Sequence, residues 1–251
     1  MRKVVVYCGT RNLYEDMLTA AKSLVINTNV DQIYFLIEDD EFPFEIPDPR
    51  IKCINVANQT YFKEEGPNYK SKWTYMVLIR AALSKILPNE DVVLSLDVDT
   101  IVDKDISALW DLNISHYNIA AAREPYKSTG NYVYINMGVA LLNLKRLRET
   151  KLDDEIIYCL NRFYYAANEQ DCINDKCQGR ILEISPNYNV CDFTSRNIIS
   201  DPTIIHFAGI HSWNTKDIVL KYKEMPWPQK EEPIKIAPVA PKKTTRKKKN
   251  D

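Results

Sequence analysis

Two aspartates with one residue between them follow directly on an apolar stretch near the middle of the chain. The stretch is VVLSL at residues 92–96, and Asp97-Val98-Asp99 come next. Residues i and i+2 of an extended chain point to the same side, so both carboxylates can face one spot at the carboxyl end of a strand. Two like charges that close repel unless a cation lies between them, and carboxylate oxygens suit a divalent ion that also binds phosphate. The spacing alone fits a polar turn after a strand equally well.

The strand before these aspartates is one of several in an alternating order of strands and helices. We expect strands at residues 3–7, 31–37, 51–56, 92–96, 119–122, 181–184 and 204–206, a strand running into a basic helix within residues 132–148, and helices at residues 13–26, 68–87 and 153–165. Short helical turns are expected at residues 105–110 and 168–174. This order predicts an α/β fold, and in open α/β sheets ligands bind at the carboxyl ends of the strands.

Length and composition limit the classes of protein to consider. The chain has 251 residues, of which 45% are hydrophobic, so it can bury one sizeable core. We expect one domain at residues 1–225 and a Pro- and Lys-rich tail at residues 226–251 that is disordered or loosely tethered. The formal net charge of -1 argues against nucleic acid as a partner. The basic run in the tail predicts either a weak peripheral contact with a membrane surface or an acidic partner, or only a solubilising end.

The cysteines point to a reducing compartment. All six are scattered, and they include no C-x-x-C pair. The first residues do not resemble a signal peptide, so we expect reduced thiols in a cytoplasmic protein. Since no apolar run reaches the length of a membrane-spanning helix, the sequence predicts a soluble or at most peripheral protein.

Further polar residues stand where a nucleotide could bind. Thr10, Asn12 and Tyr14 follow the first strand and lie over the edge of the expected sheet, although the G-x-G-x-x-G fingerprint of dinucleotide-binding proteins is absent. One face of the expected helix at residues 68–87 carries two cations, one of them Arg80. That face is either solvated, the commoner outcome, or it lines the cleft, where Arg80 would bind a diphosphate in bidentate fashion.

Four sequence motifs in this order resemble the family 8 retaining glycosyltransferases, the group that includes glycogenin and the bacterial lipooligosaccharide galactosyltransferases. They are VVLSLDVDTIVDKDISALW from residue 92, YINMGVALLNLKRLR from residue 134, NEQDCIN from residue 168 and HFAGIHSW from residue 206. The resemblance implies a single-domain glycosyltransferase of the A type (GT-A), in which a Rossmann-like mixed sheet flanked by helices binds a UDP-hexose donor with Mn(II). It covers most of residues 3–215.

The resemblance assigns the metal ligands position by position. Asp97 and Asp99 match the family's Asp-x-Asp ligands, and His206 matches the histidine that completes the protein's share of the coordination. Two carboxylates and one imidazole, with diphosphate oxygens in the remaining octahedral positions, favour Mn(II), with Mg(II) as the alternative. The chain has three histidines, and we expect His116 to be structural or exposed.

The same resemblance assigns contacts to the nucleotide. Thr10 and Tyr14 match the family's uracil and ribose contacts, with Tyr14 stacking on the base and Asn12 beside them. Gly209, in the HFAG stretch, and His211 belong to the part that contacts the diphosphate.

The sugar and the anomeric carbon are assigned to other positions. Asn136 and Gly138 match the sugar-binding Asn-x-Gly turn, where glycine lets the backbone approach the donor closely. Gln170 and Asp171 match the family's motif beside the anomeric carbon, so we expect them to act in catalysis together with Asn136. Glu124 is a further candidate for a hydroxyl contact, with a looser alignment.

The sequence departs from the family pattern in two places. Glu169 replaces the first aspartate of the usual Asp-Gln-Asp motif, which lengthens that arm by one methylene. The family's diphosphate-binding lysine is absent, and His211 or Ser212 stands in its place. We hypothesise that protonated His211 or Lys216 takes over its role.

The reaction implied is transfer of a hexosyl group with retention at the anomeric carbon. No carboxylate stands out as a covalent nucleophile, which favours attack by the acceptor on the face that the leaving group vacates. Two other classes stay open: a nucleotidyltransferase or phosphotransferase of similar fold, which would also use paired aspartates and a metal, and a catalytically silent binding scaffold, which the missing lysine makes possible. The sequence leaves open whether the hexose is glucose or galactose, and whether the acceptor is a glycan, a lipid-linked sugar or a protein.

Overall fold

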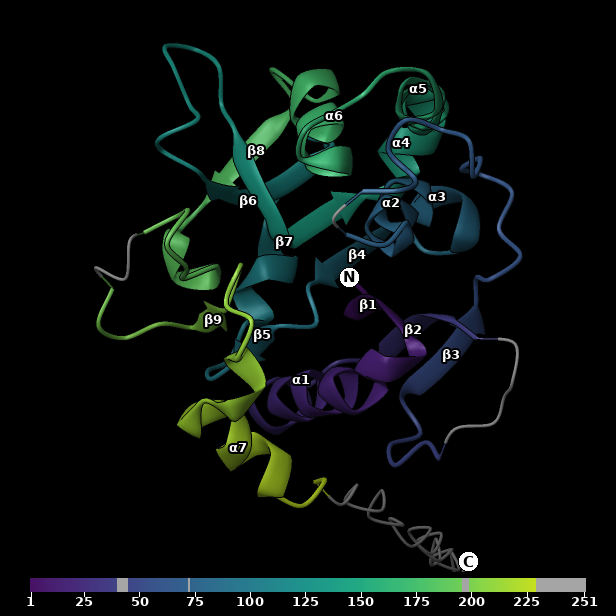
Figure 1. The fold of residues 1–251 in the computed structure, drawn as a ribbon. Coiled ribbons are helices and arrows are strands. Elements are labelled where there is room, and N and C mark those ends of the chain that lie inside the picture. Colours follow the sequence, from purple (N-terminus) through teal and green to yellow (C-terminus); the bar gives the residue numbers. More distant parts are fainter. Residues whose placement is uncertain (40–44, 72, 196–198, 229–251) are drawn as a thin grey trace, which may run out of the picture.

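A mixed seven-stranded sheet of order β3-β2-β1-β4-β7-β6-β8 runs through the computed structural model, which describes residues 1–39, 45–71, 73–195 and 199–228 (Figure 1). Its strands are β1 (Val4–Thr10), β2 (Gln32–Glu38), β3 (Ile51–Asn55), β4 (Val92–Leu96), β6 (Ile119–Arg123), β7 (Ile135–Asn143) and β8 (Ile181–Ile184). Strand β7 is antiparallel to β4 and β6, whereas the other neighbours are parallel. Every residue of β4 and β7 is buried, as expected of central strands covered on both faces.

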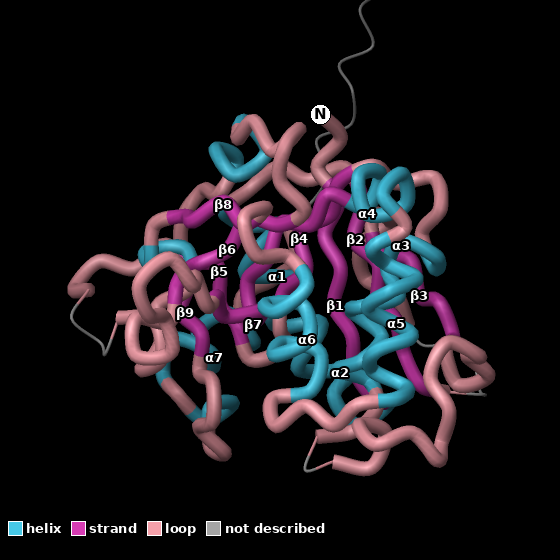
Figure 2. The backbone as a smooth tube through the Cα atoms, turned by 90° about the horizontal axis from the view of Figure 1, so that it is seen from above, coloured by secondary structure: helices cyan, strands magenta, loops and turns pink. Residues whose placement is uncertain are grey.

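Helices cover both faces of this sheet, which confirms the predicted α/β class. One face carries α1 (Tyr14–Asn27), with α7 (Asp217–Glu224) alongside it. The other face carries α2 (Met76–Ile79), α3 (Leu83–Ile86), α4 (Leu144–Thr150), α5 (Leu152–Arg162) and α6 (Asn168–Lys176), as Figure 2 shows from above. Among the described residues, every helix is too short or too polar to cross a lipid bilayer.

A second, two-stranded sheet lies beside the carboxyl end of β4. It pairs β5 (Thr100–Val102) with β9 (Ile204–His206) in antiparallel fashion, with Thr100 opposite His206. Helix α7 packs against it through a small core of Ile101, Phe207, Val219 and Tyr222. The strand at residues 204–206 confirms the prediction, whereas β5 was not expected from the sequence.

The predicted single helix over residues 68–87 is wrong. Helical structure begins only at Met76, and a 3-10 turn at Arg80–Ala82 separates α2 from α3. The reason is tertiary: the buried Asn68 side chain donates hydrogen bonds to the carbonyls of Leu160 (2.6 Å) and Phe163 (2.7 Å). These bonds tie the first part of the segment to the end of α5 in a non-helical path, and such contacts override helix propensity. Of the two cations expected on one helix face, Arg80 lies in the 3-10 turn, and Lys72 lies outside the described residues.

Candidate active site

Strand ends bring the three predicted metal ligands together. Asp97 follows β4 directly, Asp99 precedes β5, and His206 ends β9. Main-chain hydrogen bonds fix these positions: the Asp97 N–H donates to the carbonyl of Gly138 on β7 (2.8 Å), and the Phe207 N–H donates to the carbonyl of Asp99 (2.9 Å). The trio therefore depends on sheet pairing rather than on flexible loops.

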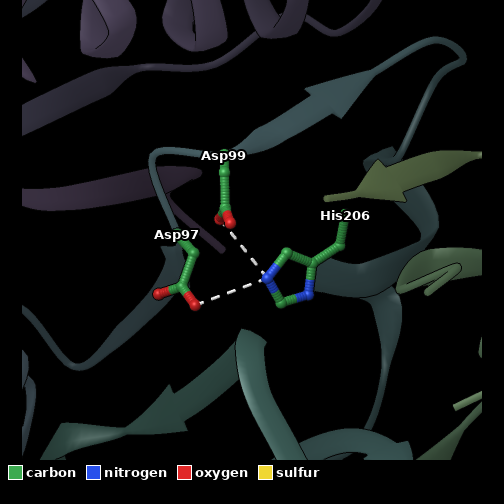
Figure 3. Close-up of side chains that lie close together, drawn as sticks. All are labelled: Asp97, Asp99 and His206. Atoms are coloured by element: carbon green, nitrogen blue, oxygen red, sulfur yellow. Dashed lines mark ion pairs between the residues drawn. The ribbon is translucent and has the colours of Figure 1, made fainter. Parts of the chain in front are cut away.

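The trio of Asp97, Asp99 and His206 converges on one point (Figure 3). The Nε2 atom of His206 lies 3.3 Å from Oδ1 of Asp99 and 3.6 Å from Oδ2 of Asp97. One ligand atom from each residue lies within 4.8 Å of the other two. Two carboxylates and an imidazole on one point form a donor set that fits a divalent transition metal such as Mn(II).

The charges of the trio are strongly coupled. Burial lowers the pKa of His206, but Asp99 and Asp97 outweigh this effect and raise the pKa to about 10. Burial raises the pKa of Asp99, and the facing imidazole lowers it by more, so the net shift is downward. Without a metal ion, a protonated His206 is the cation between the two carboxylates. A divalent ion held by the trio would take the place of the proton on Nε2.

Gly138 leaves room for the imidazole ring. A Cβ atom at this position would lie 2.1 Å from Cε1 of His206, far inside van der Waals contact. The sequence predicted that this glycine lets the backbone approach the donor. The structure shows that the His206 ring fills the space beside Gly138, so the absence of a side chain at this position makes room for the ring.

The other nitrogen of His206 contacts a residue that sequence reasoning missed. Nδ1 lies 2.8 Å from Oδ1 of Asn189, which is fully buried. Asn189 stands in the irregular stretch between β8 and β9, where no periodicity marks it. The only signal was the apolar pair Val190-Cys191 behind it, which indicates that this stretch enters the core.

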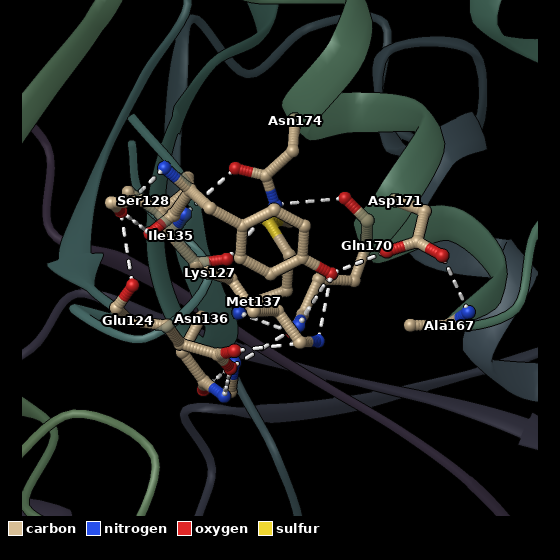
Figure 4. A network of polar contacts seen from close by, with 12 residues as sticks. Glu124, Lys127, Ser128, Ile135, Asn136, Met137, Ala167, Gln170, Asp171 and Asn174 are labelled. Carbon is tan, nitrogen blue, oxygen red and sulfur yellow. Dashed lines mark hydrogen bonds and ion pairs between the residues drawn. The ribbon is translucent and has the colours of Figure 1, made fainter. Parts of the chain in front are cut away.

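A group of polar side chains just after β6, at the start of β7 and on α6 lies beside the trio; we call Glu124, Tyr134, Asn136 and Gln170 the amide network. Glu124, Asn136 and Gln170 are labelled in Figure 4. Asn136 donates from Nδ2 to Oε1 of Glu124 (2.7 Å), and Gln170 donates from Nε2 to the same oxygen (3.3 Å). Gln170 also donates to the Tyr134 hydroxyl (3.1 Å), and its Oε1 accepts from the Met137 N–H (3.0 Å). The structure thus brings the predicted Asn136, Gln170 and Glu124 together.

Asp171 lies at the edge of this network, with both carboxylate oxygens engaged. One accepts from the Tyr134 hydroxyl, and the other accepts from the Ala167 N–H (2.7 Å) at the start of α6. The second bond is a capping contact, because it satisfies a main-chain donor at a helix start. Asp171 therefore supports Tyr134 and the position of α6.

Arg80 is buried behind Asp97. Its Nη2 donates to Oδ1 of Asp97, and its Nη1 donates to the Met137 carbonyl (2.5 Å) and lies 3.6 Å from Oε1 of Glu169. Glu169 is buried as well, and burial raises its pKa to about 7 against the opposing effect of the Arg80 guanidinium. In this structure Arg80 orients Asp97, and its contact with a diphosphate stays a prediction.

The residues predicted to contact the nucleotide after the first strand differ in their exposure to solvent. Thr10 and Asn12 lie at the open end of β1, and the Thr10 hydroxyl donates to Oδ1 of Asn12. Tyr14 is 7% exposed, with its ring edge-on to Phe35 at 6.0 Å and its hydroxyl donating to the Glu45 carbonyl (2.5 Å). The ring therefore belongs to the core under this end of the sheet and does not stand open for stacking.

The loop after β9 carries the remaining predicted residues. Gly209 has a φ of +77°, in the left-handed region that glycine adopts readily, and it turns the chain so that the Ile210 N–H donates to the Phe207 carbonyl (2.9 Å). His211 and Lys216 are both exposed beyond this turn. Their role as a substitute for the missing lysine stays a prediction.

Comparisons with known proteins agree with this geometry. The family model for glycosyl transferase family 8 matches residues 4–216. A Haemophilus influenzae protein named as a glycosyltransferase is 28% identical over 59% of this chain and 51% of its own length. Glycosyltransferase GlyD of Streptococcus pneumoniae is 25% identical over 91% of this chain and 31% of its own length, so the chain spans only part of these relatives.

Solved structures show the same fold. Glycosyltransferase GlyE of Streptococcus pneumoniae superposes with a TM-score of 0.69 at 21% identity, over 90% of this chain and 61% of that one. The galactosyltransferase LgtC, crystallised with donor and acceptor sugar analogs, superposes with a TM-score of 0.65 at 16% identity, over 88% of this chain and 95% of that one. The predicted GT-A fold is thereby confirmed.

Proposed function

Since the chain belongs to glycosyl transferase family 8, we propose that it transfers a hexose, glucose or galactose, from a UDP-sugar to an acceptor with retention at the anomeric carbon. The observation that carries the proposal is the convergence of Asp97, Asp99 and His206 on one point beside the amide network. A divalent ion, Mn(II) or else Mg(II), would be held by this trio. When bound, it supplies Lewis-acid stabilisation of the charge that develops on the departing diphosphate.

The residues of the chain have separate tasks in this reaction. Arg80 orients Asp97, and Glu124 fixes the amide groups of Asn136 and Gln170 beside the trio. Gln170 already donates to Glu124 and Tyr134, so a sugar hydroxyl would contact this preorganised network in exchange for one of these bonds or through a remaining oxygen lone pair.

The nearby carboxylates support a mechanism without a covalent intermediate. Glu124 accepts from two amides, both oxygens of Asp171 accept hydrogen bonds, and Glu169 faces Arg80. Each of the three carboxylates is thus held by donors of the protein, which lowers its nucleophilicity. This supports attack by the acceptor on the face that UDP leaves, rather than double displacement.

The acceptor belongs to the proposal only as a class: a glycan, a lipid-linked sugar or a protein. We propose a cytoplasmic location, which is supported by the fact that all six cysteines are unpaired. The proposed weak membrane contact of the basic tail rests on residues 229–251, which lie outside the described residues.

The experiment is UDP release from a panel of UDP-sugars in the presence of Mn(II), Mg(II) or EDTA. We expect one donor to be hydrolysed with Mn(II), and Asp99→Asn to abolish this, because it removes a charged ligand. The matched control is Asp111→Asn, an exposed aspartate outside the trio, which should behave as wild type. Release of pyrophosphate would instead indicate a nucleotidyltransferase. Absence of both hydrolysis and Mn(II)-dependent UDP binding would indicate a silent scaffold.

A further inference from the structure

A continuous chain of hydrogen bonds leads from the backbone of β7 to the imidazole of His206. The Gly138 N–H donates to Oδ1 of Asn136 (2.9 Å), and Nδ2 of Asn189 donates to the same oxygen (2.9 Å). Oδ1 of Asn189 then faces Nδ1 of His206 at 2.8 Å. The three side chains that form this series of hydrogen bonds are all buried: Asn136 is 5% exposed, Asn189 0% and His206 4%.

The direction of every bond follows from its first member. A backbone N–H can only donate, so the Asn136 atom that faces Gly138 is the oxygen, and its amide nitrogen points to the carboxylate of Glu124. The Asn189 atom that faces this oxygen must then be the NH2 group. The other end of the Asn189 amide is therefore an oxygen, which can only accept from Nδ1 of His206.

The opposite orientation of Asn189 is excluded by its surroundings. Reversal would place two carbonyl oxygens 2.9 Å apart, between Asn136 and Asn189, with no proton between them. Losing this hydrogen bond in a buried site is costly, because neither oxygen can form a replacement hydrogen bond with water. The backbone of Asn189 is also fixed: its N–H donates to the Pro186 carbonyl (2.9 Å), and its carbonyl accepts from the Thr194 hydroxyl.

We propose that Asn189 is a positioning residue that keeps a proton on Nδ1 of His206, and so makes Nε2 the nitrogen that offers its lone pair to a divalent ion between Asp97 and Asp99. The imidazole has two nitrogens that could lose a proton, and only Nε2 faces the carboxylates. Asn189 decides between them, because its oxygen has no proton to give. The inference rests on the proposed function insofar as this point binds a metal ion.

The first test reads the tautomer directly. In protein labelled with 15N-histidine and loaded with Mg(II) alone, we expect the His206 spectrum of a ring protonated at Nδ1 and bare at Nε2. Wild-type protein that shows a bare Nδ1 would overturn the proposal, whatever the variants do. Mg(II) is chosen because it is diamagnetic.

The second test measures Mn(II) binding by the loss of the free-ion EPR signal. Asn189→Leu should weaken Mn(II) binding by about 10- to 100-fold, the usual effect of removing the partner of a metal-bound histidine. Asn189→Asp should keep the proton on Nδ1, since a carboxylate also accepts from it, but it should lower the stability of the fold, because its second oxygen would face Oδ1 of Asn136 with no proton between them. Asn187→Leu, a half-exposed asparagine of the same stretch, is the matched control and should bind as wild type.

Cys191 provides a second control, because its thiol also lies beside His206. Cys191→Ala should leave both the tautomer and the Mn(II) affinity unchanged. The proposal is overturned if a folded Asn189→Leu variant binds Mn(II) like wild type, or if Cys191→Ala and not Asn189→Leu changes the tautomer.

The two proposals can fail separately. Absence of any Mn(II) or Mg(II) binding by wild-type protein would refute the proposed metal site. In that case, protection of the Nδ1 proton from solvent exchange in ion-free wild-type protein, and its loss in Asn189→Leu, would still support the role of Asn189. A rapidly exchanging Nδ1 proton in ion-free wild-type protein would contradict it.

Discussion

The two halves of the site are supported in different ways. On the metal side, main-chain bonds hold the trio: Asp97 is tied to β7, and Asp99 to the residue after His206. In the amide network, side chains hold one another, since Glu124 accepts from both Asn136 and Gln170. The metal side thus inherits its geometry from sheet pairing, whereas the network depends on mutual satisfaction of buried polar groups.

This difference predicts how far a substitution reaches. A change in the amide network leaves buried donors or acceptors without partners, which costs about 1–3 kcal/mol for each unpaired group. It should nevertheless leave the metal ligands in place, because their strands do not depend on it. The two halves meet at Asn136 and Asn189, and away from that junction we expect metal affinity and turnover to respond separately.

Gln170→Ala should separate the effect on turnover from the effect on metal affinity most clearly. The substitution removes the amide that donates to Glu124 and Tyr134 and accepts from the Met137 N–H, so turnover should fall by about 10²- to 10³-fold. Mn(II) affinity should not change, because Gln170 has no hydrogen bond or ion pair with the trio among the described residues. Steady-state UDP release and the EPR titration measure the two quantities. An equal fall in turnover and in Mn(II) affinity would contradict the separate support of the two halves of the site.

The pH dependence of Mn(II) binding tests the metal side alone. The pKa of His206 in ion-free protein is raised to about 10, so at neutral pH each ion that binds must displace the Nε2 proton. Affinity should therefore rise by about tenfold per pH unit, or about 100-fold from pH 6 to pH 8. If the affinity levels off near pH 7, His206 titrates like an ordinary histidine and is not held between Asp97 and Asp99.

Much of this architecture could be predicted because its signals are local. The apolar runs of β1, β2 and β4 mark buried strands, and the i, i+2 spacing of Asp97 and Asp99 places two carboxylates together within one short segment. The failed helix at residues 68–87 shows the limit. Its residues have helical composition, but the structure of its first part is decided by Asn68 bonding to Leu160 and Phe163, which are about ninety positions away in sequence.

The residues of the candidate site likewise fall into those with a local sequence signal and those whose role depends on contacts distant in sequence. Asn136 and Gln170 were found because they match motifs, and each lies next to a strand or helix start. Asn189 was missed because its task appears only when β9 brings His206 beside it. The ion pairs of Arg80 with Asp97 and Glu169 were missed as well, because no sequence pattern shows that its guanidinium is buried against them.

Gly138→Ala should displace the His206 ring of the metal side, although Gly138 itself lies on the neighbouring strand β7. The added Cβ would meet Cε1 of His206 at 2.1 Å, and overpacking of this kind costs about 1–3 kcal/mol of unfolding free energy. Displacing the ring should lower Mn(II) affinity by about tenfold, the low end of the effect of misorienting a ligand. Gly9→Ala on β1 is the control, because its Cβ would meet the flexible Sδ of Met17 at 3.1 Å and Cβ of Leu13 at an ordinary contact distance of 3.4 Å. Equal effects of the two substitutions would mean that the trio tolerates movement of His206.

Lys127→Met should have the smallest effect, although its ammonium group lies next to the network. Its Nζ is 3.4 Å from Oε2 of Glu124 and 4.4 Å from the centre of the Tyr134 ring, but the side chain is 45% exposed. Exposed ion pairs contribute about 0–1 kcal/mol, so turnover should fall less than about fivefold. Glu124→Leu is the sharp contrast: the side chain is 4% exposed, and its loss leaves the amide N–H groups of Asn136 and Gln170 without their shared acceptor. If the two substitutions reduce turnover equally, the charge of Lys127 acts on the substrate itself, and the network is not supported by its buried members alone.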